Sequence, residues 1–391
     1  MIRALSLSAV LMFVAAVTIA STALAQVEVR IAFVEQQIDP PPTLSNLDPL
    51  PDDLGRAGAE LGLEDNATTG RFLGHNYALT VHSAGSGEDF LVAARQALSE
   101  TTLLVVKAPA EALLALADLP EAADALIFNT SEQATRLRAA DCRANLLHSI
   151  TSYAMRADAL AQFMSKKRWT DWALIEGVHP DDAAFAEALR ASAGKFGLRI
   201  ADEKAWVFDA DMRRNAAQEV PLFTQALEDY DVLVVADELG DFGRYLLYNT
   251  WEPRPVAGSE GVAPRAWSGV VEQWGAAQLQ SRFADLAGRR MLSKDYAAWA
   301  ALRSIGEAVT RTGSADPAVL RAYILSDAFE LAGFKGRPMS YRGWNGQLRQ
   351  PVPLVHPRAL VALAPLEGFL HQRSELDTLG LDEPESACRA F

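Results

Sequence analysis

The sequence contains few of the residues and motifs on which most enzymatic catalysis depends. Among its 391 residues are two cysteines and six histidines, and the histidines are scattered without metal-ligand spacing. It holds no Gly-x-Ser-x-Gly, His-Glu-x-x-His, Cys-x-x-Cys or Gly-Lys-Ser/Thr motif. We therefore expect no catalytic residue, no bound metal and no resident cofactor, and we expect that the protein is not an enzyme.

Positive charge and long apolar runs are also scarce. Lysine and arginine total 36 against 50 acidic residues, so the formal net charge is −14, which argues against nucleic acid as a partner. Beyond the N-terminal segment no apolar run approaches the ~20 residues of a membrane-spanning helix. The remaining composition, 50% hydrophobic and 22% charged, is that of a globular protein, and the length suits two domains.

The N-terminal segment carries the features of a secretory signal peptide. Residues 1–25 contain a positive charge at Arg3, an apolar run, and the small-x-small sequence Ala23-Leu24-Ala25. This pattern predicts export and cleavage after Ala25.

The two cysteines, Cys142 and Cys388, allow two interpretations. In an oxidising compartment they can form a disulfide, which would attach the C-terminal tail to the middle of the chain. They can also be two unrelated thiols, because the sequence does not give the Cα separation that a disulfide requires.

Apolar strands and amphipathic helices alternate in two consecutive series. In the first we expect strands at Val27–Val34, Asn76–His82, Thr102–Val106 and Ala125–Phe128, with helices at Asp53–Leu63, Asp89–Ser99 and Ala110–Leu116. In the second we expect strands at Trp172–Glu176, Lys204–Phe208 and Asp231–Ala236, with helices at Asp158–Lys167, from a cap at Asp181 or Asp182 to Lys195, and at Val220–Leu227. Continuous apolar strands separated by helices predict an α/β fold with parallel sheets covered on both faces.

The last third of the chain does not continue this alternation. Two helices, Tyr296–Thr312 and Ser314–Leu325, precede an expected hairpin of Met339–Tyr341 with Val352–Val355, whose turn contains Asn345-Gly346. These elements are too few for a third domain. We expect them to complete the two earlier units, so that the chain crosses between the units several times.

This order of elements resembles the type I periplasmic substrate-binding proteins of ABC transporters, of the branched-chain amino acid kind. The resemblance rests on the export signal, the restart near Ser152, the helix Tyr296–Thr312, and the segments Gly333–Gly336 and Trp344–Gln347. It implies two Rossmann-like lobes around a central cleft, made of residues 26–150 with 276–333 and of residues 151–275 with 334–391. It also implies a periplasmic monomer that captures a small-molecule ligand and delivers it to an inner-membrane permease.

Four shorter stretches are similar to a subgroup associated with PQQ-dependent alcohol dehydrogenase systems. They are Asp141–Asn145, Tyr230–Glu238, Gly368–Gln372 and Pro384–Phe391. This similarity implies PQQ as one plausible transported ligand. It also implies an alternative function, that of a periplasmic sensor or accessory protein of such an alcohol oxidation system.

In such a fold the ligand lies at loops that leave the carboxyl ends of parallel strands. The candidate ligand-binding residues at or near these loops are Lys107, Asn129, Thr130, Ser131, Tyr153, His179, Glu238 and Glu260. By the resemblance, the acidic partner of a ligand amine falls near Glu260.

Several of these candidates have a structural alternative. Lys107 pairs with a ligand carboxylate, adds to an electrophilic carbonyl if burial lowers its pKa, or is an ordinary surface lysine at a strand end. Residues 129–131 either contact the ligand or cap a helix. His179, which precedes Pro180, either contacts the ligand or is a loop histidine, and Tyr153 is an aromatic candidate near the first crossing.

Overall fold

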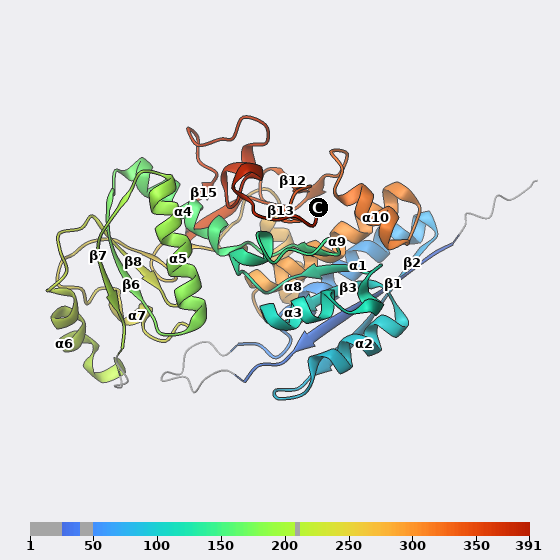
Figure 1. The fold of residues 1–391 in the computed structure, drawn as a ribbon, viewed down its shortest axis with the longest axis horizontal. Coiled ribbons are helices and arrows are strands. Elements are labelled where there is room, and N and C mark those ends of the chain that lie inside the picture. Colours follow the sequence, from blue (N-terminus) through green and yellow to red (C-terminus); the bar gives the residue numbers. More distant parts are fainter. Residues whose placement is uncertain (1–25, 40–49, 208–211) are drawn as a thin grey trace, which may run out of the picture.

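The computed structural model describes residues 26–39, 50–207 and 212–391 of the chain. It has two lobes, each built on a parallel sheet with helices on both faces (Figure 1). The expected α/β fold with two parallel sheets is thus confirmed. The expected signal peptide, residues 1–25, lies outside the described residues.

The first lobe contains a five-stranded sheet in the order β2-β1-β3-β4-β5, all parallel. Its strands are β1 Val27–Gln36, β2 His75–Ala84, β3 Leu103–Lys107, β4 Leu126–Asn129 and β5 Leu146–His148. One face packs against α1 Arg56–Leu73, α8 Ala276–Ala287, α9 Ser293–Thr312 and α10 Pro317–Ile324, and the other against α2 Phe90–Glu100 and α3 Ala110–Ala117. Successive side chains of β3 point to opposite faces of the sheet. Val105 packs in the core on the α1–α9 face, and Leu104 and Val106 pack in the core on the α2–α3 face.

The second lobe repeats this arrangement with a parallel sheet in the order β7-β6-β8-β9. Its strands are β6 Asp171–Glu176, β7 Arg199–Ala205, β8 Val232–Ala236 and β9 Val256–Gly258. One face packs against α4 Tyr153–Lys167 and α5 Pro180–Lys195, and the other against α6 Met212–Thr224 and α7 Gly243–Leu246. The predicted starts of two elements were wrong. The strand β7 begins at Arg199 and not at Lys204, and the helix α6 begins at Met212 and not at Val220.

The described chain passes between the lobes at three places that lie side by side, and a fourth time in its C-terminal tail. It leaves the first lobe after β5, returns after the short strand β10 Ala263–Pro264, and leaves again between β13 Leu348–Arg349 and β14 Val352–His356. Gln350 Nε2 donates to Ser149 O at 2.8 Å, and Arg265 N donates to Pro353 O at 3.0 Å. These hydrogen bonds join the crossings into one connection between the lobes.

The predicted hairpin was wrong in its pairing. The strand β12 Pro338–Tyr341 pairs with β13, with Tyr341 opposite Leu348, and also with β11 Leu331–Ala332. The strand β14 pairs instead with β15 Ala359–Ala364. Val352 and Leu354 of β14 pack into the core of the second lobe, and this burial separates β14 from β12.

The packing of the cores also places two segments differently from the expected lobe boundaries. Trp267 and Val271 were expected in the second lobe, but they pack in the core of the first. The same holds for Met339, Tyr341 and Leu348. Their apolar side chains face α9 and the neighbouring strands, so the chain crosses near residues 265 and 350 and not at 275 and 334.

The C-terminal tail returns to the first lobe, where Cys142 and Cys388 form a disulfide with their Cα atoms 5.6 Å apart. Phe391 packs against the core of this lobe. In Figure 1 the tail lies along one side of the molecule. No helix in the described ranges combines the length and apolarity needed to cross a bilayer.

Candidate functional site

Charged side chains from both lobes lie within electrostatic reach of one another at the strand ends. Lys107, Glu132 and Lys294 come from the first lobe, and Arg156, Asp181 and Glu238 come from the second. We call these six residues the inter-lobe cluster. Lys107 ends β3, Glu132 follows β4, and Glu238 follows β8, so the parallel sheets bring their carboxyl ends to this region.

Lys107 has a partner within its own lobe. Its Nζ lies 2.9 Å from Glu35 Oε2 and donates to Leu54 O at 3.1 Å. The two residues are opposite each other in the β1–β3 register, and Glu35 also accepts from Ser83 Oγ at 2.8 Å. Lys107 therefore connects β1 to the segment before α1 and is not an ordinary surface lysine.

Residues 129–131 are buried and shape the loop after β4. Thr130 Oγ1 donates to Val106 O at 2.9 Å, and Ser131 Oγ accepts from Ala108 N at 3.1 Å. Asn129 Oδ1 accepts from the backbone N–H groups of Ser131 and Glu132, at 3.1 and 2.9 Å. In this structure Asn129 satisfies the backbone of its own loop, and Thr130 and Ser131 join the loop to the backbone at the end of β3.

Glu238 is held by a buried guanidinium. Its Oε2 and Oε1 lie 2.5 and 2.8 Å from Arg156 Nη1 and Nη2, and Oε1 also accepts from Ser259 Oγ at 2.8 Å. Burial alone would raise the pKa of Glu238, but Arg156, with Arg265 and Ser259, outweighs burial and holds this pKa below its ordinary value. Arg156 in turn lies over the ring of Phe185, 4.4 Å from its centroid.

Tyr153 packs in the same place. It is buried in the first turn of α4, with its ring 5.7 Å from that of Phe185 and 5.6 Å from the Arg156 guanidinium. Burial, followed by the charge of Glu238, raises the pKa of Tyr153 above its ordinary value. A neutral phenol at this position is a hydrogen-bond donor and acceptor, not a charged group.

Asp182 connects two strand-end loops of the second lobe. Its Oδ1 accepts from Glu238 N at 2.6 Å, and its Oδ2 accepts from His179 N at 3.1 Å. Burial raises the pKa of Asp182 to about 6. Gly177 makes room for this carboxylate, because a Cβ at that position would lie 2.1 Å from Oδ2.

The predicted cap of α5 was wrong. His179 is the N-cap, and its Nδ1 accepts from Asp181 N at 3.2 Å. Asp182 is the residue that reciprocates from within the first turn. The structure thus gives the His179 ring a structural role at the edge of the inter-lobe cluster.

Glu260 lies in the second lobe, next to Ser259, whose hydroxyl donates to Glu238. It is partly buried, and burial raises its pKa above the ordinary value while the charges of Arg265 and Arg244 oppose that rise. Its Cγ would lie 2.8 Å from a Cβ at Gly243, so it packs closely against the start of α7.

Lys294 was missed by reasoning from the sequence. It lies in the first turn of α9, where the helix dipole disfavours a positive charge. A lysine at such a position is unusual, and this is the sequence signal that could have indicated it. Burial, followed by the charge of Lys107, lowers the pKa of Lys294. Within the described ranges its side chain has no hydrogen bond or ion pair.

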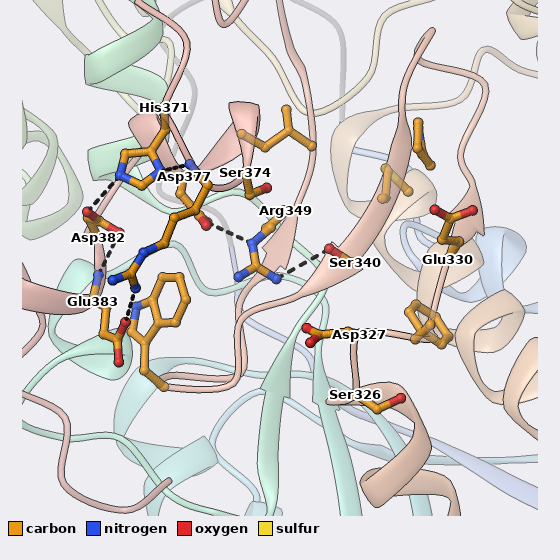
Figure 2. A pocket seen from close by; sticks show the side chains of 16 residues that line it. Ser326, Asp327, Glu330, Ser340, Arg349, His371, Ser374, Asp377, Asp382 and Glu383 are labelled. Carbon is orange, nitrogen blue, oxygen red and sulfur yellow. Dashed lines mark hydrogen bonds and ion pairs between the residues drawn. The ribbon is translucent and has the colours of Figure 1, made fainter.

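A separate cavity of about 550 Å³ lies between the C-terminal segment and the strands β12 and β13 (Figure 2). Two ion pairs line it, Arg349 with Asp377 at 2.7 Å and Arg373 with Glu383 at 3.2 Å. His371 Nε2 also lies 3.3 Å from Asp382 Oδ2. None of the ligand-binding residues predicted from the sequence lines this cavity. We place the candidate site at the inter-lobe cluster, because there the strand ends of both sheets contribute polar groups. No group of three or more histidine, cysteine or acidic side chains in the described part of the chain could hold a metal ion.

Comparisons with known proteins agree with this architecture. The family model described as a periplasmic binding protein matches residues 52–212. A branched-chain amino acid ABC transporter periplasmic ligand-binding protein from Burkholderia xenovorans is 16% identical, with a TM-score of 0.69 over 93% of this chain and 100% of that one. An ABC transporter substrate-binding protein from Sphaerobacter thermophilus is 15% identical, with a TM-score of 0.68 over 86% and 98% of the two chains.

A third solved structure has a ligand class in its name. The leucine-, isoleucine-, valine-, threonine- and alanine-binding protein from Brucella ovis, in its closed conformation, is 15% identical, with a TM-score of 0.65 over 87% of this chain and 93% of that one. No relative was found among curated protein sequences. At these identities the solved structures show that the chain has the two-lobed type I periplasmic binding protein fold.

Proposed function

We propose that this protein is the periplasmic substrate-binding component of an ABC transporter. It captures a small solute between its lobes and delivers it to an inner-membrane permease. The observation that carries this proposal is the inter-lobe cluster, in which polar and charged strand-end groups of two sheets face one another. The match of residues 52–212 to a periplasmic binding protein family supports it.

The crossings between the lobes provide a hinge for such a function. They lie together and are short, and their hydrogen bonds at Ser149, Arg265 and Gln350 keep them adjacent. Rotation at these few residues moves one packed lobe against the other. A ligand that contacts both lobes favours the closed arrangement by its differential affinity for the two states.

The ligand belongs to a class of small, polar solutes that carry charge. Amino acids are one class, supported by the names of the structural neighbours. PQQ is a second and finer proposal, which rests on the four stretches similar to proteins of PQQ-dependent alcohol dehydrogenase systems. The accessory or sensor function in such a system is the alternative that the following experiment separates.

The experiment is a binding screen of the mature protein by thermal shift and isothermal titration calorimetry. The panel contains branched-chain amino acids, PQQ, and small carboxylic acids and alcohols. We expect saturable one-to-one binding without turnover of the ligand, and a rise in Tm that corresponds to about 2.7 kcal/mol at a ligand concentration of 100 times Kd. If no compound binds and the protein co-purifies with a periplasmic dehydrogenase, the accessory function replaces the transport function.

A further inference from the structure

Lys107 and Lys294 approach each other around one glycine. Gly55, with a φ of 85°, lies just before α1, and its N–H donates to Asp295 Oδ1 at 2.7 Å. A Cβ at Gly55 would lie 3.5 Å from Lys107 Cδ and 3.9 Å from Lys294 O. The stem of one lysine and the backbone of the other therefore border the space beside the same glycine, and the charges of Asp181 and Glu238 act on Lys294 there.

The two lysines differ in what holds their ammonium groups. Lys107 pairs with Glu35 and donates to Leu54 O. Lys294 has no such partner among the described residues. An ammonium group that is partly removed from water and unpaired costs free energy, which an anionic partner offsets.

Three carboxylates act on the charge of Lys294 without forming an ion pair with it. Glu132, Asp181 and Glu238 attract its charge from a distance, but none is within ion-pair range. Glu238 is held by Arg156, and Glu132 Oε1 accepts from Ala134 N at 2.8 Å. The Asp181 side chain is 49% exposed, so water solvates its carboxylate. The cluster thus presents one cation of the first lobe to which an incoming anion can bind.

We propose that Lys294 binds a carboxylate of the ligand, and that the ligand is therefore a carboxylic acid. This assignment rests on the proposed function, because it requires that a solute binds between the lobes. In it Lys107 has a positioning role: Glu35 fixes its ammonium group, which donates to Leu54 O and so holds the segment before α1, next to Lys294. The carboxylate also reduces the repulsion between the two ammonium groups.

The test uses matched acids and neutral derivatives as probes: leucine with leucinamide, succinate with succinamide, and PQQ with its trimethyl ester. Calorimetry measures each pair on the wild type, Lys294→Gln, Lys294→Arg, and Lys167→Gln. The last variant removes an equal charge from the exposed end of α4. We expect at least one acid to bind the wild type tenfold or more tightly than its derivative. Lys294→Gln should remove that preference, Lys294→Arg should retain it, and Lys167→Gln should leave it unchanged.

Three outcomes overturn the assignment of Lys294. Two of them leave the proposed function intact, and the third overturns it as well. If Lys294→Gln weakens the acid and its derivative equally, Lys294 holds the lobes together and does not bind the carboxylate. If the acid binds Lys294→Gln as tightly as the wild type, Lys294 lies outside the site, and the proposed function stands in both cases. If no probe and no other compound of the screen binds the wild type, the proposed function itself fails. Circular dichroism melting of each variant establishes that it is folded.

Discussion

Two ion pairs at strand ends, one in each lobe, differ in the number of contacts between their partners and in the burial of the cation. In the second lobe Arg156 and Glu238 make two parallel contacts, and their side chains are only 3% and 10% exposed. In the first lobe Lys107 and Glu35 make one contact, with side chains 18% and 1% exposed. A guanidinium matches both oxygens of a carboxylate, whereas an ammonium is a point charge that water or a neighbouring carbonyl can also satisfy.

The loops around these ion pairs differ in the same way. In the first lobe Thr130 and Ser131 are neutral and bind backbone atoms of their own lobe. In the second lobe Asp182 and Glu238 are carboxylates that connect one strand-end loop to the next. The second lobe therefore depends on charge for its local structure, and the first lobe keeps a cation, Lys294, available for a ligand.

The largest expected effect comes from breaking the pair of the second lobe. Arg156→Met leaves the Glu238 carboxylate buried without its cation, and we expect a loss of about 3–5 kcal/mol in the free energy of unfolding. Urea denaturation measures this loss. The double variant Arg156→Met with Glu238→Gln should recover much of it, because no charge is then left buried. A single variant as stable as the wild type would contradict the difference between the lobes.

The next effect is a pH dependence that the second lobe should show at Asp182. Because burial raises the pKa of this carboxyl from 3.8 to about 6, the folded state favours its protonated form. The resulting stability is present below about pH 4 and is lost as the pH rises through about 6, by at most about 3 kcal/mol at 1.4 kcal/mol per unit.

Asp182→Asn should remove this slope, since the amide does not titrate. Urea denaturation between pH 4 and pH 7 provides the measurement, and the exposed Asp124→Asn is the matched control. Equal slopes for the wild type and Asp182→Asn would show that the charge of Asp182 is not coupled to folding.

The smallest effect is expected in the first lobe. Lys107→Met removes the ion pair of Glu35, which keeps its hydrogen bond from Ser83. The side chain of Lys107 is 18% exposed, so part of the lost interaction is replaced by water. We expect a loss of about 1 kcal/mol in the free energy of unfolding. This is the lower limit of the cost, about 1–3 kcal/mol, of leaving a buried polar group without a partner. A loss as large as that of Arg156→Met, in the same urea titrations, would remove the contrast between the two ion pairs.

Much of the site followed from the rule that strand ends carry the functional groups. The apolar runs Thr102–Val106 and Asp231–Ala236 located Lys107 and Glu238 without a structure. Lys294 did not follow a strand, so this rule could not find it. Its position depends on the packing of α9 against the segment before α1. There Asp295 accepts a hydrogen bond from Gly55 N, which lies 240 residues earlier in the chain.

By itself the sequence determined the α/β class, the two series of strands and helices, and most strand-end residues, because these depend on local patterns of apolar side chains. Only the tertiary structure decided where the chain crosses between lobes, which strand pairs with β14, and that Cys142 and Cys388 are joined. It also decided which charges are paired. Ion pairs such as Arg156–Glu238, and the absence of one at Lys294 among the residues that the structure describes, depend on contacts between distant segments, and no local pattern contains that information.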